Sequence, residues 1–417
     1  MTALPVSVVV VSRGRPDLLI RCLTGLAQLC YRNFEIVVAA DRTGHDAVCA
    51  RQLDTGIKLL HFDEANISRA RNAALARASG EVVAFIDDDA VPEPSWLDQL
   101  SAPFLESAVT AAGGFVIGRN GITFQWTARA VDRLGRKTEL EHSGEAPFVP
   151  MPPAGFSPKT EGTNFAVRRD HLVRLGGFDP AFRFYMDETD LNRRIAAAGG
   201  TTVMVPRAIV HHGFAASTRR AGDRAPTDLT EIGASSAVFL RKHAPGCNFE
   251  AELARLKREH RMALVQYMVD GGLEPRDVST RLEELAAGFA EGLERDISPT
   301  APLPDVAEPF KPLIPKKKAP ASLYFAGRPW NRKGLRAKAK AAVAAGDIVT
   351  IFRFSPTALP HRVRFHEGGW WEQRGGLFGR ASRDEPYFRL QSFRARLRKE
   401  WARVAVLRQC GRSDTKS

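Results

Sequence analysis

Three short segments near the start of the chain are almost wholly apolar, and they restrict the fold more than any other feature. They are residues 6–11 (VSVVVV), residues 34–40 (FEIVVAA) and residues 82–86 (VVAFI). A strand that is exposed on one face alternates apolar and polar residues, whereas short continuous apolar runs are typical of strands that are buried on both faces. Such strands occur in parallel sheets that helices cover on both sides.

Segments with helical periodicity separate these runs. Apolar residues recur at helical spacing in residues 17–29, and residues 66–80 form an alanine-rich pattern that ends in glycine. Residues 57–62 predict a further short strand. The order strand, helix, strand, strand, helix, strand predicts an α/β fold with a mostly parallel sheet.

Three consecutive aspartates, Asp87, Asp88 and Asp89, follow the third apolar run. Adjacent carboxylates repel one another and are not buried without compensation. They therefore either lie in solvent or bind a hard divalent cation, which prefers carboxylate oxygens and keeps positions open for phosphate. Asp41 ends the second run. Because ligands bind at the carboxyl ends of strands in such sheets, we expect these carboxylates to meet in one crevice.

Two later segments carry further acidic and imidazole groups. Asp187, Glu188 and Asp190 begin a predicted helix, and His211 and His212 end a predicted strand. Each group has an ordinary structural explanation, because carboxylates stabilise the first turn of a helix, acids pair with nearby arginines, and histidines form structural contacts. Their occurrence together with the aspartate triplet favours a functional site.

The order of six segments resembles the family-2 inverting glycosyltransferases with the GT-A fold. The resemblance covers about residues 5–215, through VSVVVVSRGRPDLL, FEIVVAAD, NISRARNAAL, GEVVAFIDDDAVPEPSWL, GTNFAVRRDHLVRLGGFDPAFRFYMDETDLNRRIAAAG and VHHG. It implies a mostly parallel GT-A sheet flanked by helices. It also implies transfer of a sugar, with inversion, from a nucleotide-diphosphate donor to a hydroxyl of a glycan or glycolipid in polysaccharide biosynthesis at the cell envelope.

The resemblance implies Mn²⁺ or Mg²⁺ as cofactor. Asp89 is the expected metal ligand, Asp87 is directed to the metal or the ribose, and His211 or His212 completes the metal shell. We favour His211 because it follows the apolar part of its strand directly, and because strand alternation directs only one of the two side chains inward.

The acid pair at the predicted helix start supplies the general base that the resemblance implies. In the family this is the second acid of the pair, which is Glu188 here. Because the family usually has Asp at that position, Asp187 is the alternative.

The resemblance also implies binding residues for both substrates. The nucleotide-binding set comprises Ser12, Arg15, Asp41, Arg69, Arg71, Asp87 and Asp88. Arg69 and Arg71 are two residues apart near a helix start, so we expect at most one of them to face the crevice, where it would pair with phosphate. The acceptor side is formed by Gly162, Thr163 and Asn164.

The positive charge is concentrated at the C-terminal end. Residues 301–417 contain 25 Lys and Arg against 9 Asp and Glu, whereas the remaining residues contain 35 against 38. We predict a glycosyltransferase domain at 1–245, a helical extension at 246–297, a Pro-rich linker at 298–320 and a small basic α/β region of unknown role at 321–417. The sequence has no RNA-binding or helix-turn-helix signature, so we expect no nucleic acid partner.

Residues 384–408 show an amphipathic helical pattern with arginines between the apolar positions, which are Phe393, Leu397, Trp401 and Val404. This pattern is typical either of a helix on a membrane surface or of a helix packed by its apolar stripe onto its own domain. Two interpretations are also open for the nearby Trp370 and Trp371, whose rings either stack on a sugar ring or pack in a core.

We expect a cytoplasmic protein that is peripheral at the inner face of the membrane. No run of 18 apolar residues predicts a membrane-spanning helix, and the first residues lack the basic region of a signal peptide. The five cysteines are an odd, scattered set, which predicts reduced thiols and argues against structural zinc.

Two other functions are compatible with parts of the sequence. One is a catalytically inactive glycan-binding or scaffold protein. The other is a sugar nucleotidyltransferase, which requires a glycine-rich phosphate loop with a lysine after the first strand, and the loop SRGRPDLL lacks it. A dinucleotide-binding dehydrogenase is excluded because no G-x-G-x-x-G follows the first strand.

Overall fold

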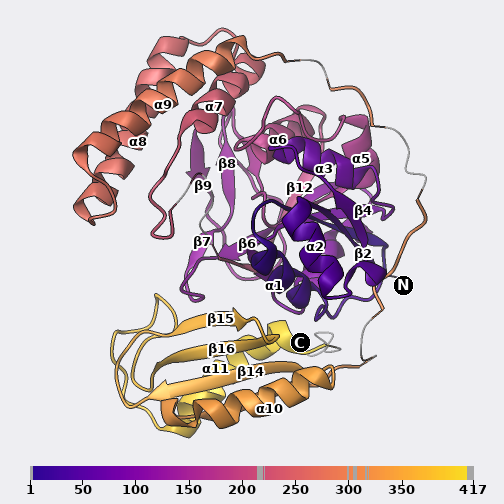
Figure 1. Ribbon diagram of the computed structural model, residues 1–417, viewed down its shortest axis with the longest axis vertical. Coiled ribbons are helices and arrows are strands. Elements are labelled where there is room, and N and C mark those ends of the chain that lie inside the picture. The colour runs from indigo at the N-terminus through magenta and orange to yellow at the C-terminus, as the bar shows by residue number, and fades with distance from the viewer. Residues whose placement is uncertain are drawn as a thin grey trace.

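The structure is a computed structural model that describes residues 3–213, 219, 221–297, 300–303, 308–314, 317 and 319–410. Figure 1 shows a large sheet with helices on both faces, a layer of helices at one end and a second sheet at the opposite end. The second sheet and its helices comprise residues 321–410, which are called the C-terminal unit below.

The large sheet has nine strands and confirms the α/β prediction. Its order is β3 (Lys58–His61), β2 (Phe34–Ala40), β1 (Val6–Ser12), β4 (Val82–Asp87), β11 (Phe165–Arg168), β6 (Val109–Ile117), β12 (Thr201–His212) and β5 (Ala90–Pro92), with β7 (Phe124–Trp126) paired to β6. The four strands from β3 to β4 are mutually parallel, and β6 is parallel to β12. Strand β11 is antiparallel to both of its neighbours, so the sheet is mixed.

Helices on both faces explain why the central strands are continuously apolar. The helices are α1 (Pro16–Leu26), α2 (Arg42–Ala50), α3 (Ile67–Leu75), α4 (Trp96–Ser101), α5 (Arg169–Arg174) and α6 (Asp187–Ala197). Val8 and Val10 belong to the core on the side of α1 and α4, whereas Val9 belongs to the core on the side of α3 and α6. Successive residues of one strand are thus buried in different layers.

A three-stranded sheet and a helical layer lie beyond the large sheet. The small sheet has the order β10 (Ser157–Lys159), β8 (Arg129–Val131), β9 (Lys137–Glu139). The helical layer comprises α7 (Thr230–His243), α8 (Phe249–Val269) and α9 (Pro275–Glu294). Helices α7 and α9 pack backbone against backbone, because a Cβ atom at Gly288 would collide with Thr230 and one at Gly292 with Ala234.

The C-terminal unit is a four-stranded sheet between two helices. Its order is β13 (Ser322–Gly327), β14 (Ile348–Ser355), β16 (Trp370–Gly376), β15 (Arg362–His366), with helices α10 (Arg332–Ala344) and α11 (Phe393–Arg408). The predicted apolar stripe of α11 packs against Phe352 and Phe354 of this sheet. The stripe is therefore used inside its own unit, and the membrane interpretation of that stripe is wrong. Trp370 and Trp371 are also buried, as the core interpretation requires.

The C-terminal unit is joined to the large sheet by buried contacts. Arg408 at the end of α11 forms an ion pair with Glu93, at 2.7 and 2.8 Å, and both side chains are buried. Gln28 donates a hydrogen bond of 2.5 Å to the carbonyl of Gly369. A disulfide joins Cys30 to Cys410, 380 positions apart.

The disulfide contradicts the prediction of reduced thiols for this pair. Cys22, Cys49 and Cys247 are free thiols. The pairing depends on where the end of α11 lies, which no local sequence pattern encodes.

Part of the predicted linker, residues 298–320, lies outside the described residues. Its described segments run against the large sheet, where Leu313 donates to the carbonyl of Phe34 and Glu308 pairs with Arg77. Within the described part of the chain, no helix combines the length and the apolar character that crossing a membrane requires.

Candidate active site

Asp87, Asp89 and His212 form a three-ligand cluster at the carboxyl ends of the central strands. One ligand atom from each residue lies within 4.8 Å of the other two. The topology explains this proximity. Asp87 ends β4, and the turn that contains Asp89 leads into β5, which pairs with β12 so that Ala90 lies opposite His212.

The hydrogen bonds of His212 orient it as a metal ligand. Its Nδ1 faces the Oε1 of Gln125 at 3.2 Å, and Oε1 can only accept, so Nδ1 carries the proton. Its Nε2 faces a carboxylate oxygen of Asp89 at 3.2 Å. A divalent cation held between these two atoms would bind both of them.

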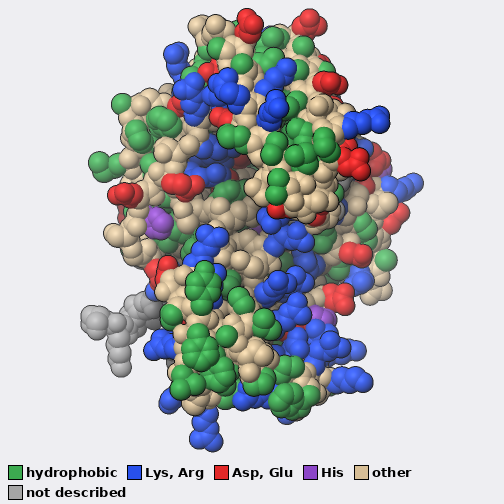
Figure 2. Space-filling view, turned by 90° about the vertical axis from the view of Figure 1, so that its left-hand side faces the viewer, with side chains coloured by type: hydrophobic (Ala, Val, Ile, Leu, Met, Phe, Trp, Pro, Cys, Tyr) green, Lys and Arg blue, Asp and Glu red, His purple; other side chains and the backbone are tan. Residues whose placement is uncertain are grey.

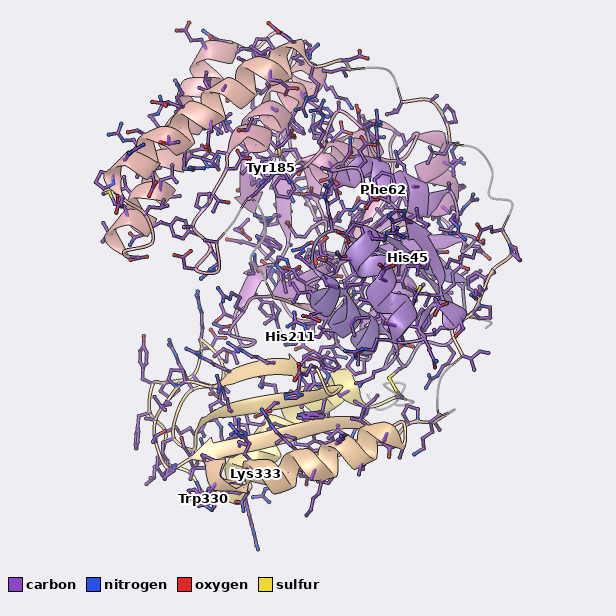
Figure 3. All side chains as sticks on the ribbon, in the orientation of Figure 1. His45, Phe62, Tyr185, His211, Trp330 and Lys333 are labelled. Atoms are coloured by element: carbon purple, nitrogen blue, oxygen red, sulfur yellow. A yellow bond between two sulfur atoms is a disulfide. The ribbon has the colours of Figure 1, made fainter. Side chains whose placement is uncertain are left out.

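His211 does not join this cluster, so the preference for it was wrong. Its Nε2 lies 2.8 Å from Glu93, and its ring contacts Trp371 of the C-terminal unit. Figure 3 shows His211 at the boundary between the large sheet and the C-terminal unit. Strand alternation does direct one histidine inward, as expected, but the inward residue is His212.

Asp88 lies beneath the cluster and is fully buried. Ser12 donates to its carboxylate at 2.7 Å, and Arg15 forms an ion pair with it at 2.5 Å. Burial raises the pKa of Asp88 to about 7 against the opposing effect of Arg15. The contacts of Ser12 and Arg15 with Asp88 thus hold the triplet in place, and nucleotide binding by these residues stays a prediction.

Arg71 connects the three-ligand cluster to the acid pair. Its guanidinium bonds Asp187, lies 3.3 Å from Asp87 and donates to the carbonyl of Gly162 at 3.1 Å. It is buried over the rings of Phe178 and Phe85. Arg69 is exposed and pairs with Glu64. As expected from their spacing, only one of the two arginines lies at the candidate site.

The acid pair begins α6 after two residues with positive φ, Tyr185 at 71° and Met186 at 67°. Such backbone conformations cost about 1–3 kcal/mol each in non-glycine residues and persist where the surrounding structure enforces them. Here they turn the chain so that Asp187 and Glu188 form the first turn of the helix. Asp187 is buried against Arg71, whereas the Glu188 side chain is 16% exposed.

The two acids have opposite pKa shifts. Burial raises the pKa of Asp187 to about 6, although Arg71 acts in the other direction. Burial also opposes ionisation of Glu188, but Lys159 and Lys137 lower its pKa to about 2. The Nζ atom of Lys159 lies 3.0 Å from Glu188 Oε1. Glu188 is therefore a carboxylate at neutral pH, held through one of its two oxygens.

The predicted acceptor-side residues have different surroundings. Gly162 lies between Arg71 and Glu188, where a Cβ atom would contact both side chains. Thr163 is buried, and its hydroxyl is 3.5 Å from the backbone nitrogen of Asp87. Asn164 is fully buried, donates to two backbone carbonyls and accepts from Trp96. Its amide is therefore committed to the core and cannot face an acceptor, contrary to the prediction.

Asp41 lies at the carboxyl end of β2, as predicted. Its carboxylate caps α2 by accepting from Gly44 and also accepts from the backbone nitrogen of Gly14 at 2.9 Å. The side chain stays partly accessible. Helix α2 itself was not anticipated, because its pattern has few apolar residues.

Three residues of the site were not predicted from the sequence: Gln125, Lys137 and Lys159. Lys159 is the last residue of the short strand β10. Gln125 lies in the short strand β7. No motif marks these residues, because their roles depend on which carboxylate or imidazole the fold places beside them.

The chain is similar in sequence to several known proteins. The family model described as "Glycosyl transferase family 2" matches residues 7–160. The O-antigen biosynthesis protein RfbC of Myxococcus xanthus is 28% identical over 226 residues, which cover 50% of this chain and 17% of the relative. The pre-mycofactocin glycosyltransferase of Mycobacterium tuberculosis is 26% identical over 219 residues, which cover 50% of this chain and 42% of the relative. The chain thus spans less than two thirds of these relatives.

Among solved structures, the mannosyltransferase PcManGT from Pyrobaculum calidifontis in complex with GDP-Man and Mn²⁺ aligns with a TM-score of 0.44 and 16% identity. The alignment covers 71% of this chain and 89% of that one.

Proposed function

We propose, from the match of residues 7–160 to the family model and from the site described above, that this chain is an inverting glycosyltransferase. It transfers a sugar from a nucleotide-diphosphate donor to a hydroxyl of a glycan or glycolipid acceptor. One observation carries the proposal: Arg71 contacts both the cluster of Asp87, Asp89 and His212 and the acid pair. Segments more than a hundred residues apart in the sequence meet there.

The donor set of the cluster fits Mn²⁺ or Mg²⁺. Two carboxylates and one imidazole whose tautomer is fixed by Gln125 suit a hard or borderline divalent cation. Such a cation, held by Asp87, Asp89 and His212, supplies Lewis-acid stabilisation of the departing diphosphate. Arg15, 3.7 Å from Asp89, adds positive charge beside the cluster. In this proposal Asp41 accepts a hydrogen bond from the nucleobase.

Glu188 acts as the general base in this proposal. It is ionised and partly accessible, and Lys159 and Thr189 both bond its Oε1. The second oxygen, Oε2, takes the proton from the acceptor hydroxyl as that hydroxyl attacks the anomeric carbon on the side opposite the leaving group. Asp187 positions Arg71 and through it Asp87. The acceptor approaches along Gly162, where the missing side chain leaves room beside Glu188.

The acceptor class is taken from the relatives. RfbC is named for O-antigen biosynthesis, and the succinoglycan biosynthesis protein ExoM of Rhizobium meliloti is 29% identical over 188 residues. We propose that the acceptor here is likewise a growing glycan or glycolipid of the cell envelope.

Release of nucleoside diphosphate across a panel of nucleotide-sugar donors tests the proposal. We expect one donor to give turnover that Mn²⁺ or Mg²⁺ supports and a chelator removes. Asp89→Ala should abolish this turnover and weaken nucleotide binding. If no donor is turned over with either cation, the chain is not the proposed enzyme, and retained binding of an oligosaccharide would then favour the glycan-binding alternative.

A further inference from the structure

A cavity of about 270 Å³ lies between the large sheet and the C-terminal unit, and we propose that it binds a phosphate group of a substrate. Its walls come from α1, β5, the loop between β6 and β7, the end of β12, and β15 of the C-terminal unit. His212 belongs to this wall, so the cavity adjoins the candidate cation site. The inference rests on the proposed function, because it assigns part of a substrate to this space.

Three arginines from different elements line the cavity: Arg21 of α1, Arg119 after β6 and Arg364 of β15. Within the part of the chain that the structure describes, none of them forms an ion pair and no acidic side chain lines the cavity. Arg21 donates to the carbonyl of Asp89 at 3.2 Å, and Arg119 to the carbonyl of Gly222 at 3.1 Å. Three cations without carboxylate partners form a site for an anion.

The local charge supports this assignment. Burial lowers the pKa of Arg364, and four neighbouring arginines lower it further, namely Arg374, Arg362, Arg119 and Arg21. Figure 2 shows Lys and Arg side chains gathered across the middle and lower part of the molecule on the face in view. An anion in the cavity relieves the repulsion among these guanidinium groups.

The C-terminal unit holds the backbone on either side of Arg364 in place. Its neighbours in β15, Val363 and Phe365, pack against Val91 of the large sheet. The backbone nitrogen of Val363 donates to the carbonyl of Asn120 at 3.0 Å. Arg364 therefore extends to the cavity from a docked strand, and its side chain is exposed there.

Arginine clusters beside a divalent cation recognise phosphate, because the planar guanidinium offers paired donors to phosphate oxygens and the cation binds the same oxygens. Two sources supply such a group: the diphosphate of the donor, or a phosphate carried by the acceptor. In either case the C-terminal unit contributes directly to substrate binding, which gives its basic charge a function.

Calorimetric titration of the full chain with inorganic pyrophosphate, with and without Mn²⁺, tests the site. We expect Arg364→Ala and Arg119→Ala each to weaken pyrophosphate binding about tenfold to a hundredfold, since each removes a charge-assisted hydrogen bond. Arg364→Lys should keep part of the affinity. Lys333→Ala, on the outer side of the same unit in Figure 3, is the matched control and should bind like the wild type. Unchanged affinity in both alanine variants, with unchanged melting temperatures, would overturn the proposal.

Two further titrations separate the sources and the hypotheses. If the alanine variants also weaken binding of UDP or GDP with Mn²⁺, the donor supplies the phosphate. If the alanine variants bind the nucleotide normally but no longer bind pyrophosphate when nucleotide is saturating, the acceptor supplies the phosphate. Both results support the site. If pyrophosphate binds through these arginines but no donor is turned over, only the proposed function is refuted. If a donor is turned over but the arginine substitutions leave pyrophosphate binding unchanged, only the proposed phosphate site is refuted.

Discussion

At the scale of single residues, Glu188 is the group on which the proposed chemistry depends most. We expect Glu188→Gln to lower kcat by about 10²–10⁴, the usual contribution of a general base, while nucleotide binding stays intact. Asp89→Ala is the contrast, because it should lower metal-dependent nucleotide affinity as well. Steady-state kinetics and nucleotide titration distinguish the two variants. If Glu188→Gln keeps nearly wild-type turnover, Glu188 is not the general base, and Asp187 becomes the candidate.

The pH dependence of activity should report Asp187. Its pKa is raised to about 6 by burial, so lowering the pH through about 6 protonates the carboxylate and breaks its ion pair with Arg71. The pKa of Glu188 is about 2, so Glu188 stays ionised over this range. We therefore expect kcat/KM to fall below about pH 6 in the wild type. Asp187→Asn should be less active and should lack this acidic limb; the same limb in the variant would contradict the assignment.

At the scale of elements, the contact between the turn after β5 and the end of α11 depends on Glu93 and Arg408. Glu93→Gln leaves the Arg408 guanidinium buried without its counter-charge, and breaking a buried ion pair in this way costs about 3–5 kcal/mol. Urea unfolding at neutral pH measures the loss. The control is Glu106→Gln, at an exposed position just before β6 of the large sheet, which should leave the free energy of unfolding unchanged.

The same ion pair predicts a pH effect with a definite sign. Arg408 lowers the pKa of Glu93 to about 2 despite burial, which is below the ordinary 4.5. The stabilisation is therefore complete above about pH 4.5 and is lost as the pH falls from there toward 2. The difference between wild type and Glu93→Gln should be largest at neutral pH and should shrink near pH 3. A difference that stays constant would show that the pair does not titrate as described.

At the scale of the whole molecule, the Cys30–Cys410 disulfide closes a loop of nearly the entire chain. We expect three reactive thiols in the denatured, unreduced protein and five after reduction. Cys410→Ser should lower the free energy of unfolding by about 2–5 kcal/mol and make the C-terminal unit easier to release by proteolysis. Five thiols without reduction would show that the pair is not formed.

Local pattern determined much of the fold. Continuous apolar runs predicted the central strands, and strand ends predicted where Asp41 and the aspartate triplet lie. The resemblance, carried by six ordered segments, is confirmed by the family match over residues 7–160 together with the α/β sheet. These inferences succeeded because strand periodicity and the order of motifs are properties of neighbouring residues.

The sequence by itself determined the α/β sheet, the position of the acidic triplet and the start of the helix that bears the acid pair. The tertiary structure alone decided that His212 and not His211 faces the carboxylates, that Asn164 is buried, that Lys159 holds Glu188 and that Cys30 pairs with Cys410. The physical reason is that a side chain's partner is set by which distant segment packs beside it, and that packing minimises the energy of the whole chain and not of any one segment.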